Sequence, residues 1–106
     1  MASSEKLSQL QFLQQNLQNI ILQKQQFQNQ IVELDSALSE LNSTSQAYKI
    51  VGKIMLAASK EQLTNELKEK KEVAEVRLKN FTKQEEKLQH NIEELQQEVM
   101  KELKKK

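Results

Sequence analysis

The sequence predicts a mainly α-helical fold: a long antiparallel coiled-coil helical hairpin with one short β-hairpin at the bend that joins an oligomeric β-barrel. Two heptad-patterned arms flank a short apolar segment that contains the only glycine of a 106-residue chain without proline. The apolar fraction is 37%, with three Phe, one Tyr and no Trp, which is thin for a globular core. An extended helical chain that is stabilised by assembly with other chains accounts for these observations.

The first arm carries apolar residues at alternating steps of three and four, which is typical of a coiled-coil seam. Neither proline nor glycine interrupts it, so we expect one helix over about residues 4–43. The run Asn42 to Ser45 should end this helix, because its side chains compete for backbone hydrogen bonds. The seam consists of Leu10, Leu17, Lys24, Ile31 and Leu38 at heptad position a, and of Leu13, Ile20, Phe27, Leu34 and Leu41 at position d.

The middle segment lacks heptad spacing and is rich in β-branched residues. It predicts a β-hairpin over about residues 47–57 with a tight turn at Gly52-Lys53, where glycine supplies the positive φ that such turns require. The alternative is one helix running unbroken through residue 57. A two-stranded hairpin is marginal alone and leaves unpaired edges, so we expect it to assemble with other chains. The assembly residues are Tyr48, Ile50, Val51, Gly52, Ile54, Met55 and Leu56.

The second arm should begin after an N-cap at Ser59, with Gln62 placed to complete a reciprocal cap, and should run over about residues 60–104. Residues 1–106 then form a single domain. If the arms pair antiparallel, Lys24 and Glu85 lie in adjacent layers and can fix the register as an ion pair; alternatively, both side chains extend to water. The seam of this arm is Leu67, Lys71, Ala74, Leu78, Phe81, Glu85, Leu88, Ile92, Leu95 and Val99, while Val32, Val73 and Val76 lie off the seam and are candidates to pack under the barrel or against a neighbouring arm.

Composition excludes several classes of function. The formal net charge of +1 argues against nucleic-acid binding, which needs a clear basic excess. No apolar stretch is long enough to cross a bilayer and the start has no signal-peptide pattern, so a soluble cytoplasmic protein is expected. The lone His90 has no second His or Cys for a metal site, and no glycine-rich phosphate loop is present. We therefore expect no enzyme, no cofactor and no metal.

Several stretches together resemble the β-type subunit of the prefoldin family, over nearly the whole chain. They are Gln23 to Gln26, Ala47-Tyr48-Lys49-Ile50-Val51-Gly52-Lys53-Ile54, Ser59 to Leu63 leading to Glu66 to Lys70, and Lys83 to Leu88. The order of these stretches around the Tyr-Lys-x-Val-Gly hairpin is more specific than any one of them. The similarity is strongest to archaeal β subunits, with a eukaryotic β-type paralogue as the other possibility.

The resemblance implies a hexamer of two α-type and four β-type subunits, whose hairpins form a double β-barrel with coiled-coil arms. It further implies an ATP-independent chaperone that holds unfolded proteins at the arm tips and delivers them to a group II chaperonin. The alternative function is a structural coiled-coil adaptor or scaffold without chaperone activity.

Client binding is expected at the tip, which we define as the paired ends of the two arms. Off-seam apolar residues have least reason to be buried there, and fraying would expose seam residues as well. A cluster of lysines is a candidate for docking to the chaperonin; the alternative is a solvated helix end. The client-binding candidates are Leu7, Leu10, Phe12, Leu13, Ile92, Leu95, Val99, Met100 and Leu103, and the docking candidates are Lys101, Lys104, Lys105 and Lys106.

Overall fold

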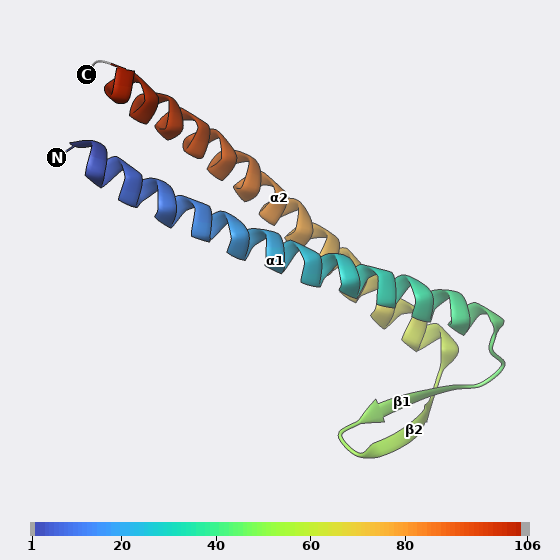
Figure 1. The fold of residues 1–106 in the computed structure, drawn as a ribbon. Helices are drawn as coiled ribbons and strands as arrows, with labels where there is room; N and C mark the ends of the chain where they lie inside the picture. Colours follow the sequence, from blue (N-terminus) through green and yellow to red (C-terminus); the bar gives the residue numbers. More distant parts are fainter. Residues whose placement is uncertain (1, 105–106) are drawn as a thin grey trace. The chain divides into compact units, whose positions relative to one another are not determined.

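The structure, a computed structural model, describes residues 2–104 of the chain, with side-chain burial described from Ser4 onward. Figure 1 shows the order of the elements: α1 (Ala2–Ser43), β1 (Ala47–Val51), β2 (Ile54–Ala58) and α2 (Lys60–Lys104). The two long helices and the antiparallel hairpin between them confirm the predicted fold class. The alternative of one helix through residue 57 is wrong, because both strands interrupt it.

Side chains mark the two helix ends that flank the hairpin. At the end of α1 the hydroxyls of Ser43 and Thr44 both donate to the carbonyl of Glu40, at 3.0 and 2.7 Å. At the start of α2 the backbone N–H of Gln62 donates to Ser59 Oγ at 3.4 Å, which makes Ser59 the N-cap. The return bond from the Gln62 side chain, expected of a reciprocal cap, is not among the hydrogen bonds of residues 2–104.

The chain divides into two compact units. The hairpin unit, residues 26–78, holds β1, β2 and the flanking parts of both helices; the end unit holds the remaining described parts of α1 and α2. In the hairpin unit the buried residues are Leu34 and Leu41 of α1 and Ala74 of α2. In the end unit they are Ile92 and Val99 of α2. All five are predicted seam positions, so the seam forms the core of each unit.

A polar pair lies within the seam of the end unit. Lys24 Nζ lies 3.3 Å from both carboxylate oxygens of Glu85, and the two side chains are only 17% and 19% exposed. The predicted ion pair is therefore confirmed, and the alternative in which both side chains extend to water is wrong. The two residues bond directly rather than merely occupying adjacent layers.

The turn between the strands explains the position of the single glycine. Val51 pairs with Ile54, which leaves Gly52 and Lys53 as a two-residue loop. Gly52 has a φ of +62° whereas Lys53 has a negative φ, the combination found in a type II′ turn. A Cβ at residue 52 would meet nothing within 4 Å, so the backbone conformation, and not space, favours glycine here.

Candidate functional site

The tip, in the end unit, exposes apolar side chains from both helices. The N-terminal end of α1 and the C-terminal end of α2 lie at the same end of this unit (Figure 1). The four off-seam candidates are 48–63% exposed, which is high for residues of this size and hydrophobicity. They are Leu7 and Phe12 on α1, and Met100 and Leu103 on α2.

The five seam candidates at the tip are covered to different degrees. Ile92 and Val99 are buried at 7% and 6% exposure. Leu10, Leu13 and Leu95 are half-buried. Helix α1 is continuous from Ala2 and α2 continues to Lys104, so contact of these seam residues with a client requires the two helices to separate.

An ion-pair cluster joins the two helices at the tip. Lys6 Nζ lies 2.6 Å from Glu102 Oε1 and 3.6 Å from Glu98 Oε2. The hydrogen bond to Glu102, supported by the negative charge of both carboxylates, raises the pKa of Lys6 above its ordinary 10.5. Leu7 and Leu103 directly follow Lys6 and Glu102 in the sequence. The link therefore holds the helix ends together beside two of the exposed apolar residues.

Sequence reasoning missed the Lys6 link. Lys6 and Glu102 occupy heptad position d, one heptad before Leu13 and one heptad after Leu95, but they lie just beyond the apolar residues from which the seam was identified. The available signal was the antiparallel register, which brings the start of α1 close to the end of α2.

Two of the candidate docking lysines, Lys101 and Lys104, lie in the last turn of α2 and are exposed. Cations at this position also favour the negative end of the helix dipole. Lys105 and Lys106 lie outside the described residues.

The β-hairpin exposes apolar side chains on both of its faces. In its register Ile50 pairs with Met55 and Val51 pairs with Ile54. Because successive side chains of a strand alternate, Ile50 and Met55 belong to one face, and Val51 and Ile54 to the other. The six large apolar side chains are 50–68% exposed: Tyr48, Ile50, Val51, Ile54, Met55 and Leu56. The two-stranded sheet has an open edge on each side as well.

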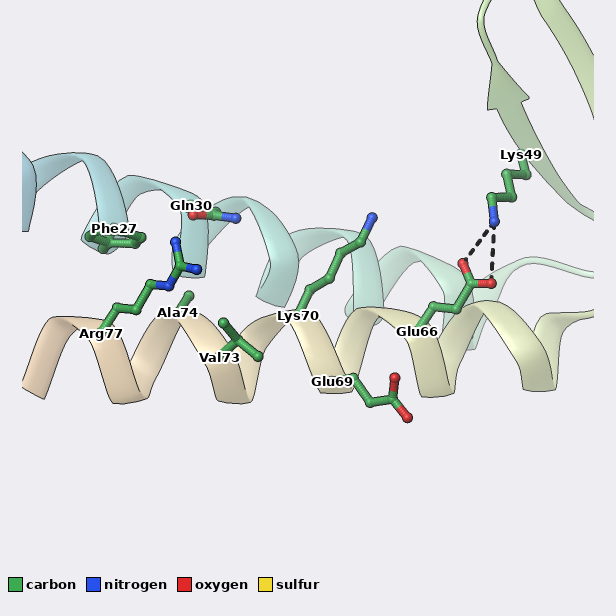
Figure 2. Close-up of a pocket in the computed structure, with 9 residues that line it drawn as sticks. All are labelled: Phe27, Gln30, Lys49, Glu66, Glu69, Lys70, Val73, Ala74 and Arg77. Carbon is green, nitrogen blue, oxygen red and sulfur yellow. Dashed lines mark hydrogen bonds and ion pairs between the residues drawn. The ribbon is translucent and has the colours of Figure 1, made fainter.

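A salt bridge fixes the hairpin to α2 within the hairpin unit. Figure 2 shows Lys49 reaching from β1 to Glu66, with Nζ 3.2 Å from both carboxylate oxygens. Beside this contact lies an open groove of about 500 Å³. Along it the guanidinium of Arg77 lies 5.9 Å from the centre of the Phe27 ring, within the range of a cation–π contact. The first contact links β1 to α2, and the second links α1 to α2.

Three further apolar residues of the hairpin unit are exposed: Val32 at 63%, Val73 at 54% and Val76 at 59%. Val73 lines the groove shown in Figure 2. Their exposure within this unit leaves them available to pack against another chain.

The described polar residues do not form a metal-binding cluster. His90 is exposed, and its Nε2 lies 3.0 Å from Glu94 of the same helix. Within residues 2–104 no group of three or more His, Cys, Asp or Glu side chains is placed to hold a metal ion. None of the described helices is long and apolar enough to span a membrane.

Comparisons with known proteins agree with this geometry. The family model described as "Prefoldin subunit" matches residues 4–106. The prefoldin subunit beta of Pyrococcus abyssi is 41% identical over 96 residues, covering 88% of this chain and 82% of that protein. The one from Pyrobaculum neutrophilum is 38% identical over 93 residues, covering 85% of this chain and 74% of that protein.

A solved structure gives the same result for the fold. The crystal structure of the prefoldin beta subunit from Thermococcus strain KS-1 superposes with a TM-score of 0.91 at 36% identity. The match covers 96% of this chain and 92% of that one. The chain therefore belongs to the prefoldin family of chaperones, in its β-subunit class.

Proposed function

We propose that this chain is a subunit of an ATP-independent holding chaperone that captures unfolded proteins at its tip and delivers them to a group II chaperonin. The observation that carries the proposal is the exposure of Leu7, Phe12, Met100 and Leu103 at the paired ends of α1 and α2. Flexible apolar side chains such as Met adapt to clients without a fixed shape. Such contacts hold a client without any catalytic step.

The proposal includes assembly through the β-hairpin with other prefoldin subunits, in a hexamer of two α-type and four β-type chains in the cytoplasm. Membership of the family supports assembly with such subunits. The exposed apolar residues on both hairpin faces and the open strand edges support the hairpin as the contact. Each tip binds weakly, but several tips around one client raise the effective concentration of binding sites.

Delivery is assigned to the lysines at the end of α2, which would dock to an acidic surface of the chaperonin. Lys101 and Lys104 are exposed, as such docking requires. Attraction between exposed charges is screened by salt, so this contact should weaken as ionic strength rises.

The test compares a tip variant with a control variant that carries one replacement outside the tip, both in the assembled complex. The tip variant replaces Leu7, Phe12, Met100 and Leu103 by Ser, and the control replaces Leu22 by Ser. Leu22 is 58% exposed in the end unit but lies outside the tip. Light scattering of a denatured client, without ATP, should show loss of aggregation suppression in the tip variant only. Equal suppression by both variants would remove the tip from the mechanism.

A structural adaptor without chaperone activity makes a different prediction in the same assay. The chain mixed with an α-type partner would then form a stable complex that leaves client aggregation unchanged.

A further inference from the structure

A groove between α1 and α2 in the end unit is not used by the tip or by the hairpin. Its volume is about 460 Å³, within the range of small binding sites. Ile20 of α1 and Phe81 and Leu88 of α2 give it an apolar lining, and all three are half-buried. The groove therefore has room and an apolar surface for one side chain of a ligand.

The polar lining of this groove is almost entirely carboxamide. Asn16, Asn19 and Gln23 contribute from α1, and Gln84 and Asn91 from α2. Within the described part of the chain none of these five side chains forms a hydrogen bond or ion pair. The only charged residue lining the groove is Lys87, and no carboxylate lines it.

The heptad pattern makes this composition unusual. Asn16 and Gln23 occupy position g of α1, directly before the seam residues Leu17 and Lys24. Gln84 occupies the equivalent position before Glu85 on α2. Positions e and g of coiled coils commonly carry Glu and Lys, which form ion pairs between helices. Neutral amides at these positions forgo that attraction but place free donors and acceptors along one side of the groove.

We propose that this groove binds the main chain of an extended, unfolded polypeptide, in addition to the apolar contacts at the tip. A carboxamide carries both a donor and an acceptor, as a peptide group does, so it can pair with main-chain N–H and C=O groups. Recognition of the main chain does not depend on client sequence, and the apolar lining accepts one client side chain. A polyanionic ligand would meet only one cation, Lys87, and a cationic ligand would meet no carboxylate. The inference rests on the proposed holding function and adds a second contact to it.

The test uses the full chain carrying the four Ser replacements at the tip, so that tip binding does not mask the groove. Gln23→Met with Gln84→Met removes two amides at similar side-chain size. Gln18→Met with Gln97→Met is the matched control, because both glutamines are exposed in the end unit and neither lines the groove. The probe is a short, fluorescently labelled peptide of Gly and Ser with one central Leu, capped at both ends, and its affinity is read by fluorescence anisotropy.

The Gln23/Gln84 variant should bind the probe about tenfold more weakly, because two hydrogen bonds to the main chain of the peptide are lost. The control variant should bind as tightly as the chain with both glutamine pairs intact. The same peptide with methylated backbone nitrogens should bind weakly to every variant, because its N–H donors are gone.

Four results would overturn the groove proposal. Two concern the peptides: no binding of the probe before the glutamines are replaced, or tight binding of the methylated peptide. Two concern the variants: unchanged affinity in the Gln23/Gln84 variant, or an equal loss of affinity in both glutamine variants. A change in self-association with unchanged peptide affinity would instead make the groove a contact between copies of this chain. Failure of the proposed function is distinguishable, because it appears as unchanged client holding when the tip alone is replaced.

Discussion

Gly52 occupies a turn position that requires a positive φ, and the space around it is open. Its φ of +62° lies in the left-handed region, where a Cβ costs about 1–2 kcal/mol per residue. No atom within 4 Å would oppose the added Cβ itself. The effect of a substitution should therefore come from the backbone alone.

Replacing Gly52 by Ala should destabilise the hairpin by about 1–2 kcal/mol, and Asn should cost less because it tolerates this conformation. Amide hydrogen exchange across residues 47–58 should become about fivefold to thirtyfold faster in the Ala variant. Lys53→Ala is the control, since Lys53 has a negative φ. Equal exchange in the Ala variants at positions 52 and 53 would contradict the backbone argument.

Lys24 and Glu85 are coupled by a direct contact at 3.3 Å in a mostly buried setting. Lys24→Met or Glu85→Met alone leaves one charge unpaired near the seam and should cost about 1–2 kcal/mol. The double Met variant should cost less than the sum of the single variants, because no charge then remains unpaired. Urea unfolding followed by circular dichroism measures this cycle. Strict additivity would mean that the two residues do not stabilise one another.

The apolar seam was predictable residue by residue, because heptad spacing directly determines which side chains face the other helix. Leu34, Leu41 and Ala74 are buried as that spacing predicts. The predicted turn at Gly52 followed equally from backbone chemistry. Contacts of long charged side chains were harder to predict. The pair of Lys24 with Glu85 was predictable because apolar seam residues flank both, whereas Lys6 and Glu102 lie at seam positions beyond the last apolar residues of the pattern.

The helices are each continuous, with α1 covering Ala2–Ser43 and α2 covering Lys60–Lys104. Their pairing at the tip combines apolar burial with ion pairs. Ile92 and Val99 provide buried apolar area, and Lys6 links α1 to Glu102 and Glu98 of α2. Separation of the ends would uncover the half-buried Leu10, Leu13 and Leu95. Under the proposed function, which tip residues would contact a client was therefore not predictable from pattern, because it would depend on how readily the ends open.

The Lys6 link should open in alkali. Its folded-state pKa is raised above 10.5, so the stability it contributes is fully present below about pH 10.5 and is lost as pH rises through the folded-state value. Fluorescence energy transfer between labels at Gln9→Cys and Gln97→Cys should fall over this range, and the chain has no other cysteine to be labelled.

Lys6→Gln in the same labelled chain is the control, and it should show lower energy transfer already at neutral pH with little further change in alkali. Lys71, whose pKa is also raised by its hydrogen bond to Asp35, belongs to the hairpin unit and lies outside the labelled region. An unchanged alkaline transition in the Lys6→Gln variant would assign the opening to other groups.

At the scale of the whole molecule, the exposed surface of the hairpin favours assembly. A two-stranded sheet with apolar residues on both faces is marginally stable in water, whereas strands of other chains would pair with its edges and a packed layer would cover its faces. Several copies of the tip in one complex would then act on one client together, which is how weak individual contacts give firm holding.

Charging the hairpin should separate assembly from helix formation. Ile50 and Ile54 lie on opposite faces of the sheet, and they are 68% and 62% exposed, so Asp at either position should be tolerated in the single chain. In a complex those faces are expected to be covered, and burial of an unpaired carboxylate is strongly unfavourable.

Ile50→Asp with Ile54→Asp should therefore abolish the complex with an α-type partner, measured by light scattering, while circular dichroism retains most of the helix signal. Lys53→Asp, which replaces a positive charge by a negative one in the turn between the two strands, should leave assembly largely intact. The single variants report which face is covered: a loss confined to Ile50→Asp would place the face of Ile50 and Met55 at the contact. Assembly that survives the double change would show that the complex forms through another surface, such as the exposed Val32, Val73 and Val76 of the hairpin unit.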